Sequence, residues 1–118
     1  MAKSKIQRIE VGARMSQAVI HGDTVYLAGV VADDPVPSVA KQTKQVLASV
    51  DKLLKKAGTD KSRILKANIW LSDIRTFNEM NAVWDKWVSK GNTPARATVE
   101  APLAGTEYLV EIMVTAAR

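Results

Sequence analysis

Two charged residues near the C-terminal end of the chain stand where they could do chemistry. Arg96 opens the alternating run RATVEA, residues 96–101, directly after a proline turn at Pro94. Glu111 lies within EYLVEIMVTAA, residues 107–117, which is otherwise largely apolar. A guanidinium can bind an anion and a carboxylate can exchange protons, but a buried charge is costly unless it is paired. Arg96 and Glu111 therefore either neutralise structural partners or line a cleft at a subunit boundary.

Side chains alternate along the strand that holds Glu111, which separates an apolar face from a mixed one. We expect the apolar face to lie beneath helices, and it consists of Val110, Ile112, Val114 and Ala116. The opposite face carries Leu109, Glu111, Met113 and Thr115. In the run 62–73, the aliphatic set Leu65, Ala67, Ile69 and Leu71 likewise alternates with Lys66, Asn68, Trp70 and Ser72.

The face turned away from the helices would then carry three large apolar side chains, Leu109, Met113 and Trp70. A patch of this kind on an open sheet usually marks an interface. The sequence therefore predicts a homo-oligomer assembled through this face, in which Glu111 is buried or half-buried.

The periodicity of apolar residues predicts the elements that position these side chains. Strands are expected at 5–11, at 62–73, in two runs after Pro94, and in a hairpin at 17–31 with a type II′ turn at Gly22-Asp23. Amphipathic helices are expected at 39–57, capped by Ser38 or Asp34 and closed by Gly58, and at 74–88, with Phe77, Met80, Asn81, Trp84 and Val88 on one stripe. Two helices covering one face of a mixed sheet make a two-layer α+β sandwich, and the chain, residues 1–118, is expected to form one domain.

The composition is that of an ordinary soluble globular protein, with 47% hydrophobic residues, 25% charged residues and a formal net charge of +5. The absence of cysteine excludes disulfides and cysteine metal sites, and it suits a cytoplasmic protein. Residues 1–11 lack the apolar run of a signal peptide, and no window is apolar enough to cross a bilayer. The lysines are spread along the wet face of the helix at 39–57, which disfavours a nucleic-acid surface.

Four stretches together resemble the RidA/YjgF family, the reactive intermediate (enamine/imine) deaminases. They are TPARATVEA at 93–101, LVEIMVTAA at 109–117, VYLAGVV at 25–31, and FNEMNAVWDKWV at 77–88. The resemblance covers nearly the whole chain and its order of elements. It implies a chorismate-mutase-like fold and a homotrimer whose sheets form a central barrel, with clefts between neighbouring subunits.

The resemblance also implies an activity, the hydrolysis of 2-imino or enamine acids to 2-keto acids and ammonia without a metal or organic cofactor. Arg96 matches the arginine that binds the substrate carboxylate, a task suited to its planar fork of donors. Glu111 matches the glutamate that positions or activates water. Gly29 matches a glycine that lets the backbone approach the ligand, and Asn81 matches the family's asparagine.

The chain departs from the family pattern at two places. Where the family often has an aromatic residue near the N-terminus, this chain has Met15 preceded by Arg14, and Ala28 stands where a serine often precedes the cleft glycine. The implied pocket thus loses a phenol and a hydroxyl and gains a thioether. We hypothesise that Arg14 favours a 2-imino acid with an acidic side chain.

Two other functions stay open. A non-catalytic module that binds small carboxylates would use the same cleft and Arg96 without turnover. An RNA-acting translation inhibitor fits less well, because the basic residues are dispersed and the single histidine, His21, borders a hairpin turn.

Overall fold

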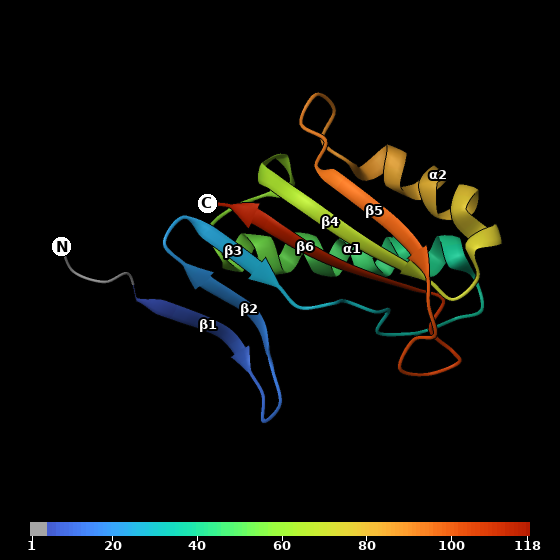
Figure 1. Cartoon of the computed structure of the whole chain (residues 1–118), viewed down its shortest axis with the longest axis horizontal. Coiled ribbons are helices and arrows are strands. Elements are labelled where there is room, and N and C mark those ends of the chain that lie inside the picture. The colour runs from blue at the N-terminus through green and yellow to red at the C-terminus, as the bar shows by residue number, and fades with distance from the viewer. Residues whose placement is uncertain (1–4) are drawn as a thin grey trace.

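The computed structural model describes residues 5–118 as a six-stranded mixed sheet with two helices on one face (Figure 1). The strands are β1 (Ile6–Val11), β2 (Ser16–His21), β3 (Thr24–Leu27), β4 (Ile64–Leu71), β5 (Ala95–Glu100) and β6 (Val110–Ala117), in the spatial order β1-β2-β3-β6-β4-β5. The helices are α1 (Val39–Lys56) and α2 (Phe77–Trp87). A short 3-10 helix, Ile74–Thr76, directly precedes α2, and another, Lys61–Arg63, precedes β4. The predicted two-layer α+β sandwich is confirmed.

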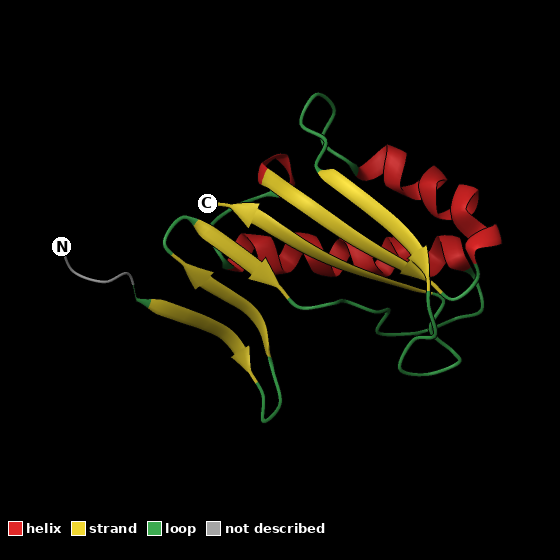
Figure 2. Cartoon of the chain, in the orientation of Figure 1, coloured by secondary structure: helices red, strands yellow, loops and turns green. Residues whose placement is uncertain are grey.

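The three strands that the helices connect, β3, β4 and β5, share one direction, which explains why both helices lie together. β6 is antiparallel to β3 and to β4, and β4 is parallel to β5. Helix α1 therefore connects two parallel strands, β3 and β4, and α2 connects the next two, β4 and β5. Because such crossovers are almost always right-handed, successive ones in the same direction place their helices on one face. Figure 2 shows α1 behind the strands, and α2 packs against α1.

Helix α1 begins and ends at the predicted signals. The Ser38 side chain accepts a hydrogen bond from the Lys41 amide, as an N-cap residue should. At the other end, Gly58 has a φ of 81° and the Thr59 amide donates to the Leu54 carbonyl, which closes the last turn. The β2–β3 hairpin also turns as predicted, since Gly22 has a positive φ and Asp23 does not.

The core lies between the helices and the inner face of the sheet. The predicted inner residues of β6 are all buried, and they pack with the buried stripe of α1, with Met80 and with Trp84. One buried polar residue ties the loops to this core. Gln42 donates to the carbonyls of Val36 and Glu107, and its own carbonyl accepts from the Leu109 amide.

Two apolar residues were assigned to the wrong face. Leu65 was expected beneath the helices, but it is 54% exposed, because the register of β4 against β6 shifts between Ile64 and Lys66. This β-bulge puts Ile64 into the core in its place. Leu109 was expected on the open face, but it precedes β6 and packs against the core, so strand alternation does not apply to it.

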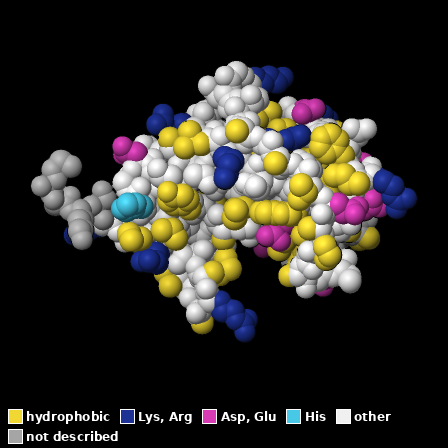
Figure 3. Space-filling model, in the orientation of Figure 1, with side chains coloured by type: hydrophobic (Ala, Val, Ile, Leu, Met, Phe, Trp, Pro, Cys, Tyr) yellow, Lys and Arg dark blue, Asp and Glu magenta, His cyan; other side chains and the backbone are white. Residues whose placement is uncertain are grey.

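The open face of the sheet is apolar, as the alternation predicted, although the residues that form it are only partly the predicted ones. Figure 3 shows hydrophobic side chains gathered across this face. Met113 and the half-buried Trp70 lie there, and the register adds Tyr26 beside Thr115 and Val99 beside Trp70. Tyr26 and Val99 are about half exposed in the single chain.

The hairpin of β1 and β2 extends beyond the cover of the helices, as Figure 1 shows. All residues of β1 except Ile9 are exposed. Glu10 has a φ of 51°, a left-handed conformation that is uncommon for a residue other than glycine. Its carboxylate pairs with the Lys56 ammonium of α1 at 2.6 Å, and this contact links the edge strand to the helix layer.

Candidate functional site

Arg96 lies on the helix-covered face of the sheet. β5 starts directly after Pro94 and runs parallel to β4, with Arg96 in register with Ala67, which is fully buried beneath the helices. Residues in register on adjacent strands point to the same face. The Arg96 side chain therefore points toward α2 and not into the open face.

Three side chains of α2 hold the Arg96 guanidinium. Its Nη1 donates to Asn81 Oδ1 at 2.8 Å, and its Cζ lies 5.1 Å from the Trp84 ring centroid and 5.8 Å from that of Phe77. We call these four residues the arginine cluster. Aromatic rings in this position attract a cation and restrict its movement.

The arginine cluster contains a cation without a carboxylate partner. Burial lowers the pKa of Arg96, and the charge of Asp85 opposes that shift only in part. Ion pairs among residues 5–118 join Lys56 to Glu10 and Arg75 to Asp73, but none involves Arg96. A guanidinium remains charged at neutral pH even when partly buried. The cluster is therefore suited to bind an external anion.

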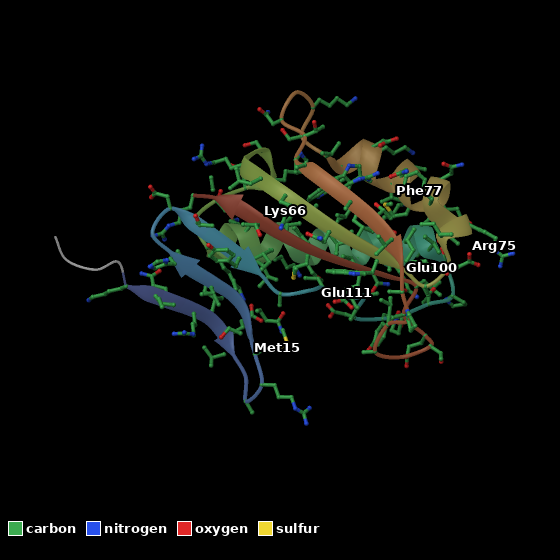
Figure 4. All side chains as sticks on the ribbon, viewed as in Figure 1. Met15, Lys66, Arg75, Phe77, Glu100 and Glu111 are labelled. Carbon is green, nitrogen blue, oxygen red and sulfur yellow. The ribbon has the colours of Figure 1, made fainter. Side chains whose placement is uncertain are left out.

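Glu111 lies on the opposite face of the same sheet. It pairs with Trp70 of β4 and shares the open face with Met113 and Thr115. The side chain is half-buried, and no hydrogen bond within residues 5–118 involves its carboxylate. Figure 4 shows that Glu111, on β6, lies apart from Phe77, which is on α2.

A bulge brings Gly29 against Glu111. Tyr26 pairs with Thr115, and Val30 exchanges hydrogen bonds of 2.9 and 3.0 Å with Ile112, so the stretch between them has one residue more than β6 has opposite. A Cβ built on Gly29 would overlap the Glu111 carboxylate. Glycine at position 29 is therefore required for Glu111 to occupy this place.

The other predicted site residues lie around Gly29, with one exception. Met15 lines a hollow of about 550 Å³ together with Gly29 and with Lys52 and Lys56 of α1. Ala28 is tied to β2, because its amide donates to the Gln17 carbonyl at 2.9 Å. Arg14 is exposed in the turn between β1 and β2 and does not line this hollow.

The structure thus sorts the predicted residues into two half-sites. The arginine cluster includes Asn81, and the second half-site, which we call the glutamate side, consists of Glu111 and Gly29. Met15 shares a hollow with Gly29 and α1, and Glu111 does not line that hollow. Because the two half-sites face opposite sides of one sheet, a single chain cannot bring Arg96 and Glu111 to the same small ligand. Two chains would be needed to do so.

Sequence reasoning missed three members of the surroundings of Arg96. Phe77 and Trp84 were assigned to an apolar stripe, yet Phe77 is 38% exposed and both rings face the guanidinium. Thr98 lies two residues along β5 on the same face, and its hydroxyl is buried without a hydrogen-bond partner among residues 5–118. The helical spacing did place Phe77, Asn81 and Trp84 on one stripe, but nothing in the sequence indicates which strand lies opposite that stripe.

Within the described residues, no three His, Asp or Glu side chains come together in a way that could hold a metal ion. The helices of this part of the chain are also too short or too polar to cross a membrane.

The comparisons with known proteins agree on one family. The model of the family described as Endoribonuclease L-PSP matches residues 5–118. A RutC family protein of Haemophilus ducreyi is 46% identical over 112 residues, which are 95% of this chain and 96% of that protein. A crystal structure of a YjgF-family protein from Neisseria meningitidis superposes with a TM-score of 0.95 at 43% identity, covering 97% of this chain and 95% of the other. The human 2-iminobutanoate/2-iminopropanoate deaminase is 33% identical over 103 residues, 82% of this chain and 74% of that enzyme.

Proposed function

The chain belongs to the YjgF/RutC family, and on that premise we propose that it is an imine/enamine deaminase, which hydrolyses 2-imino acids to 2-keto acids and ammonia. The observation that carries the proposal is the Arg96 guanidinium, which two aromatic rings and Asn81 hold in place while no carboxylate of residues 5–118 neutralises it. The human relative that is 33% identical is named 2-iminobutanoate/2-iminopropanoate deaminase, which is an activity of this kind.

The proposed reaction uses one residue from each half-site. Arg96 binds the substrate carboxylate through two parallel hydrogen bonds. Glu111 accepts a proton from a water molecule as the water oxygen adds to the C=N carbon, which gives a tetrahedral carbinolamine. Glu111 returns this proton to the nitrogen, which completes the neutral carbinolamine. It then moves the hydroxyl proton to the same nitrogen, so that the C–N bond breaks, ammonia leaves and the carbon becomes a ketone. The balance is one imine and one water consumed, and one 2-keto acid and one ammonia formed.

The proposal includes a homotrimer with clefts between subunits. Arg96 of one subunit would meet Glu111 of its neighbour, because the two side chains of a single chain face opposite sides of the sheet. The exposed apolar residues of the open face, Tyr26, Val99 and Met113, support assembly through that face.

The test is ammonia release from an imine generated in the same vessel by an L-amino-acid oxidase. We expect the protein to accelerate ammonia release above the spontaneous rate, and Arg96→Ala to abolish most of the acceleration. Arg63→Ala is the matched control, since Arg63 is an exposed arginine in the turn before β4. Carboxylate binding without acceleration would instead identify a non-catalytic binding module.

A further inference from the structure

A second hollow lies between the two helices, and no residue of either half-site lines it. It has a volume of about 570 Å³, a size typical of small-molecule sites. Its walls are one stripe of α1 (Ala40, Lys44, Leu47, Ala48, Asp51) and one stripe of α2 (Glu79, Ala82, Val83, Lys86, Trp87), with Lys61 at one end. No strand contributes to it, so the groove stays accessible when the open face of the sheet is covered.

The groove has an apolar floor and a rigid aromatic wall. Leu47 and Val83 form the floor, and alanines on both helices leave the space above it. The Trp87 indole N–H donates to Asp51 Oδ2 at 2.9 Å, and the Trp84 ring packs 5.3 Å from the Trp87 ring. These contacts hold the half-buried Trp87 ring at the edge of the groove.

The rim of the groove is positively charged. Lys44, Lys61 and Lys86 line it, and none of the ion pairs formed by residues 5–118 includes them. The Lys61 ammonium lies 5.3 Å from the Trp87 ring centroid. Two carboxylates, Asp51 and Glu79, also line the groove, and the Trp87 indole holds Asp51 in place without neutralising it. Three cations therefore face two anions, which leaves the rim with a net positive charge.

We propose that this groove is a second binding site, for an amphipathic organic anion that carries one carboxylate on an apolar chain or ring. The apolar part lies over Leu47 and Val83 against the Trp87 ring, and the carboxylate lies between the rim lysines. An apolar floor gives affinity by burial, whereas the lysines select an anion over a neutral molecule.

Calorimetric titration with octanoate tests the proposal, with octan-1-ol and acetate as matched probes that lack the charge and the chain. We expect octanoate to bind to the parent protein, and both other probes to bind at least about tenfold more weakly. Octan-1-ol lacks the charge that the lysines attract, and acetate lacks the apolar chain that the floor buries. Equal binding of octan-1-ol, or no binding of octanoate, overturns the proposal.

Variants assign the binding to the groove. Ala48→Leu with Ala82→Leu fills the space at two exposed helix positions, where leucine is a good helix former, and should abolish octanoate binding. Lys44→Gln with Lys86→Gln should weaken binding at least about tenfold. Lys41→Gln with Lys90→Gln removes the same charge outside the groove and should leave binding unchanged.

The deaminase cleft must be distinguished as a competing carboxylate site. Octanoate binding should persist in Arg96→Ala, and the filled-groove variant should keep the ammonia release of the parent. Loss of octanoate binding in Arg96→Ala, or unchanged binding in the filled-groove variant, places octanoate elsewhere and refutes the second site.

Discussion

Arg96 and Glu111 face opposite sides of the same sheet. Arg96 is in register with buried Ala67 beneath the helices, and Glu111 pairs with Trp70 on the open face. This relationship makes the proposed chemistry depend on two chains, and it leads to the sharpest test of the assembled cleft.

Mixed assemblies should recover activity that neither parent variant has. Arg96→Ala and Glu111→Gln should each be nearly inactive alone, because every cleft lacks one group. When the two variants are unfolded together and refolded in equal amounts, roughly a quarter of the clefts should combine an intact arginine with an intact glutamate. Ammonia release by the mixture measures this. Activity no greater than the sum of the two separate variants would mean that the groups do not meet across a subunit boundary.

Arg96→Lys should lower kcat/KM about a hundredfold, because the ammonium cannot make the two parallel hydrogen bonds of the guanidinium. Burial lowers the pKa of Arg96, and it would lower that of a lysine in the same way. Because lysine has the lower ordinary pKa, the variant should lose its remaining activity as the pH rises through the mildly alkaline range, whereas arginine stays protonated there. A pH profile of kcat/KM for both proteins checks this. If the parent and Arg96→Lys lose activity over the same alkaline pH range, the prediction is contradicted.

Phe77→Ala should raise KM by a few-fold and leave kcat nearly unchanged. The Phe77 ring restricts the Arg96 guanidinium from its exposed side, and cation–π contacts at such sites are worth about 0.5–1 kcal/mol. Because Phe77 is not part of the buried core, the unfolding transition should shift little. A fall in kcat with constant KM would show that the ring acts in some other way.

Gly29→Ala should lower kcat about a hundredfold, since the added methyl group displaces the Glu111 carboxylate. Gly91→Ala is an instructive contrast. Gly91 has a φ of 81° and open space around it, so alanine there should cost about 1 kcal/mol of stability and leave kcat unchanged. Steady-state kinetics and urea unfolding of the two variants separate the effects, and an unaltered kcat in Gly29→Ala would refute the placement of Glu111.

Gln42→Leu should reduce the free energy of unfolding by about 2 kcal/mol, because it leaves part-buried backbone groups of Val36, Glu107 and Leu109 without protein partners. Gln45→Leu on the same helix removes two bonds to Asp34, but these are exposed and water replaces them. Its cost should stay below about 1 kcal/mol. Urea unfolding at one protein concentration measures both, and equal costs would contradict the role assigned to Gln42.

Most of the fold could be predicted from the sequence, because strand and helix periods specify which side of each element is apolar. The errors occur where the period is interrupted. Leu65 lies in a bulge, and Leu109 lies before its strand begins. Neither interruption has a residue signal such as glycine or proline.

The candidate site was predictable as a set of residues but not as an arrangement. Arg96 and Glu111 stood out as charged residues in short strands, and Asn81 and Gly29 followed from the resemblance to a family. Which face Arg96 occupies depends on the register between β4 and β5, and alternation within one strand cannot supply that register. The pairing of Phe77 and Trp84 with the guanidinium depends on the same register.

The exposed edge strand β1 has a consequence for the isolated subunit. Ile6 and Val11 are 52% and 67% exposed, and one ion pair, between Glu10 and Lys56, connects β1 to the helices. Only Ile9 of β1 packs against the core, so this strand gains little from hydrophobic burial and opens at a small fraction of the free energy that the core requires. The amide protons of β1 should exchange with solvent quickly at high dilution, and slowly once other copies of the chain cover this strand. The exchange rate of β1 therefore measures subunit association while the rest of the chain stays folded.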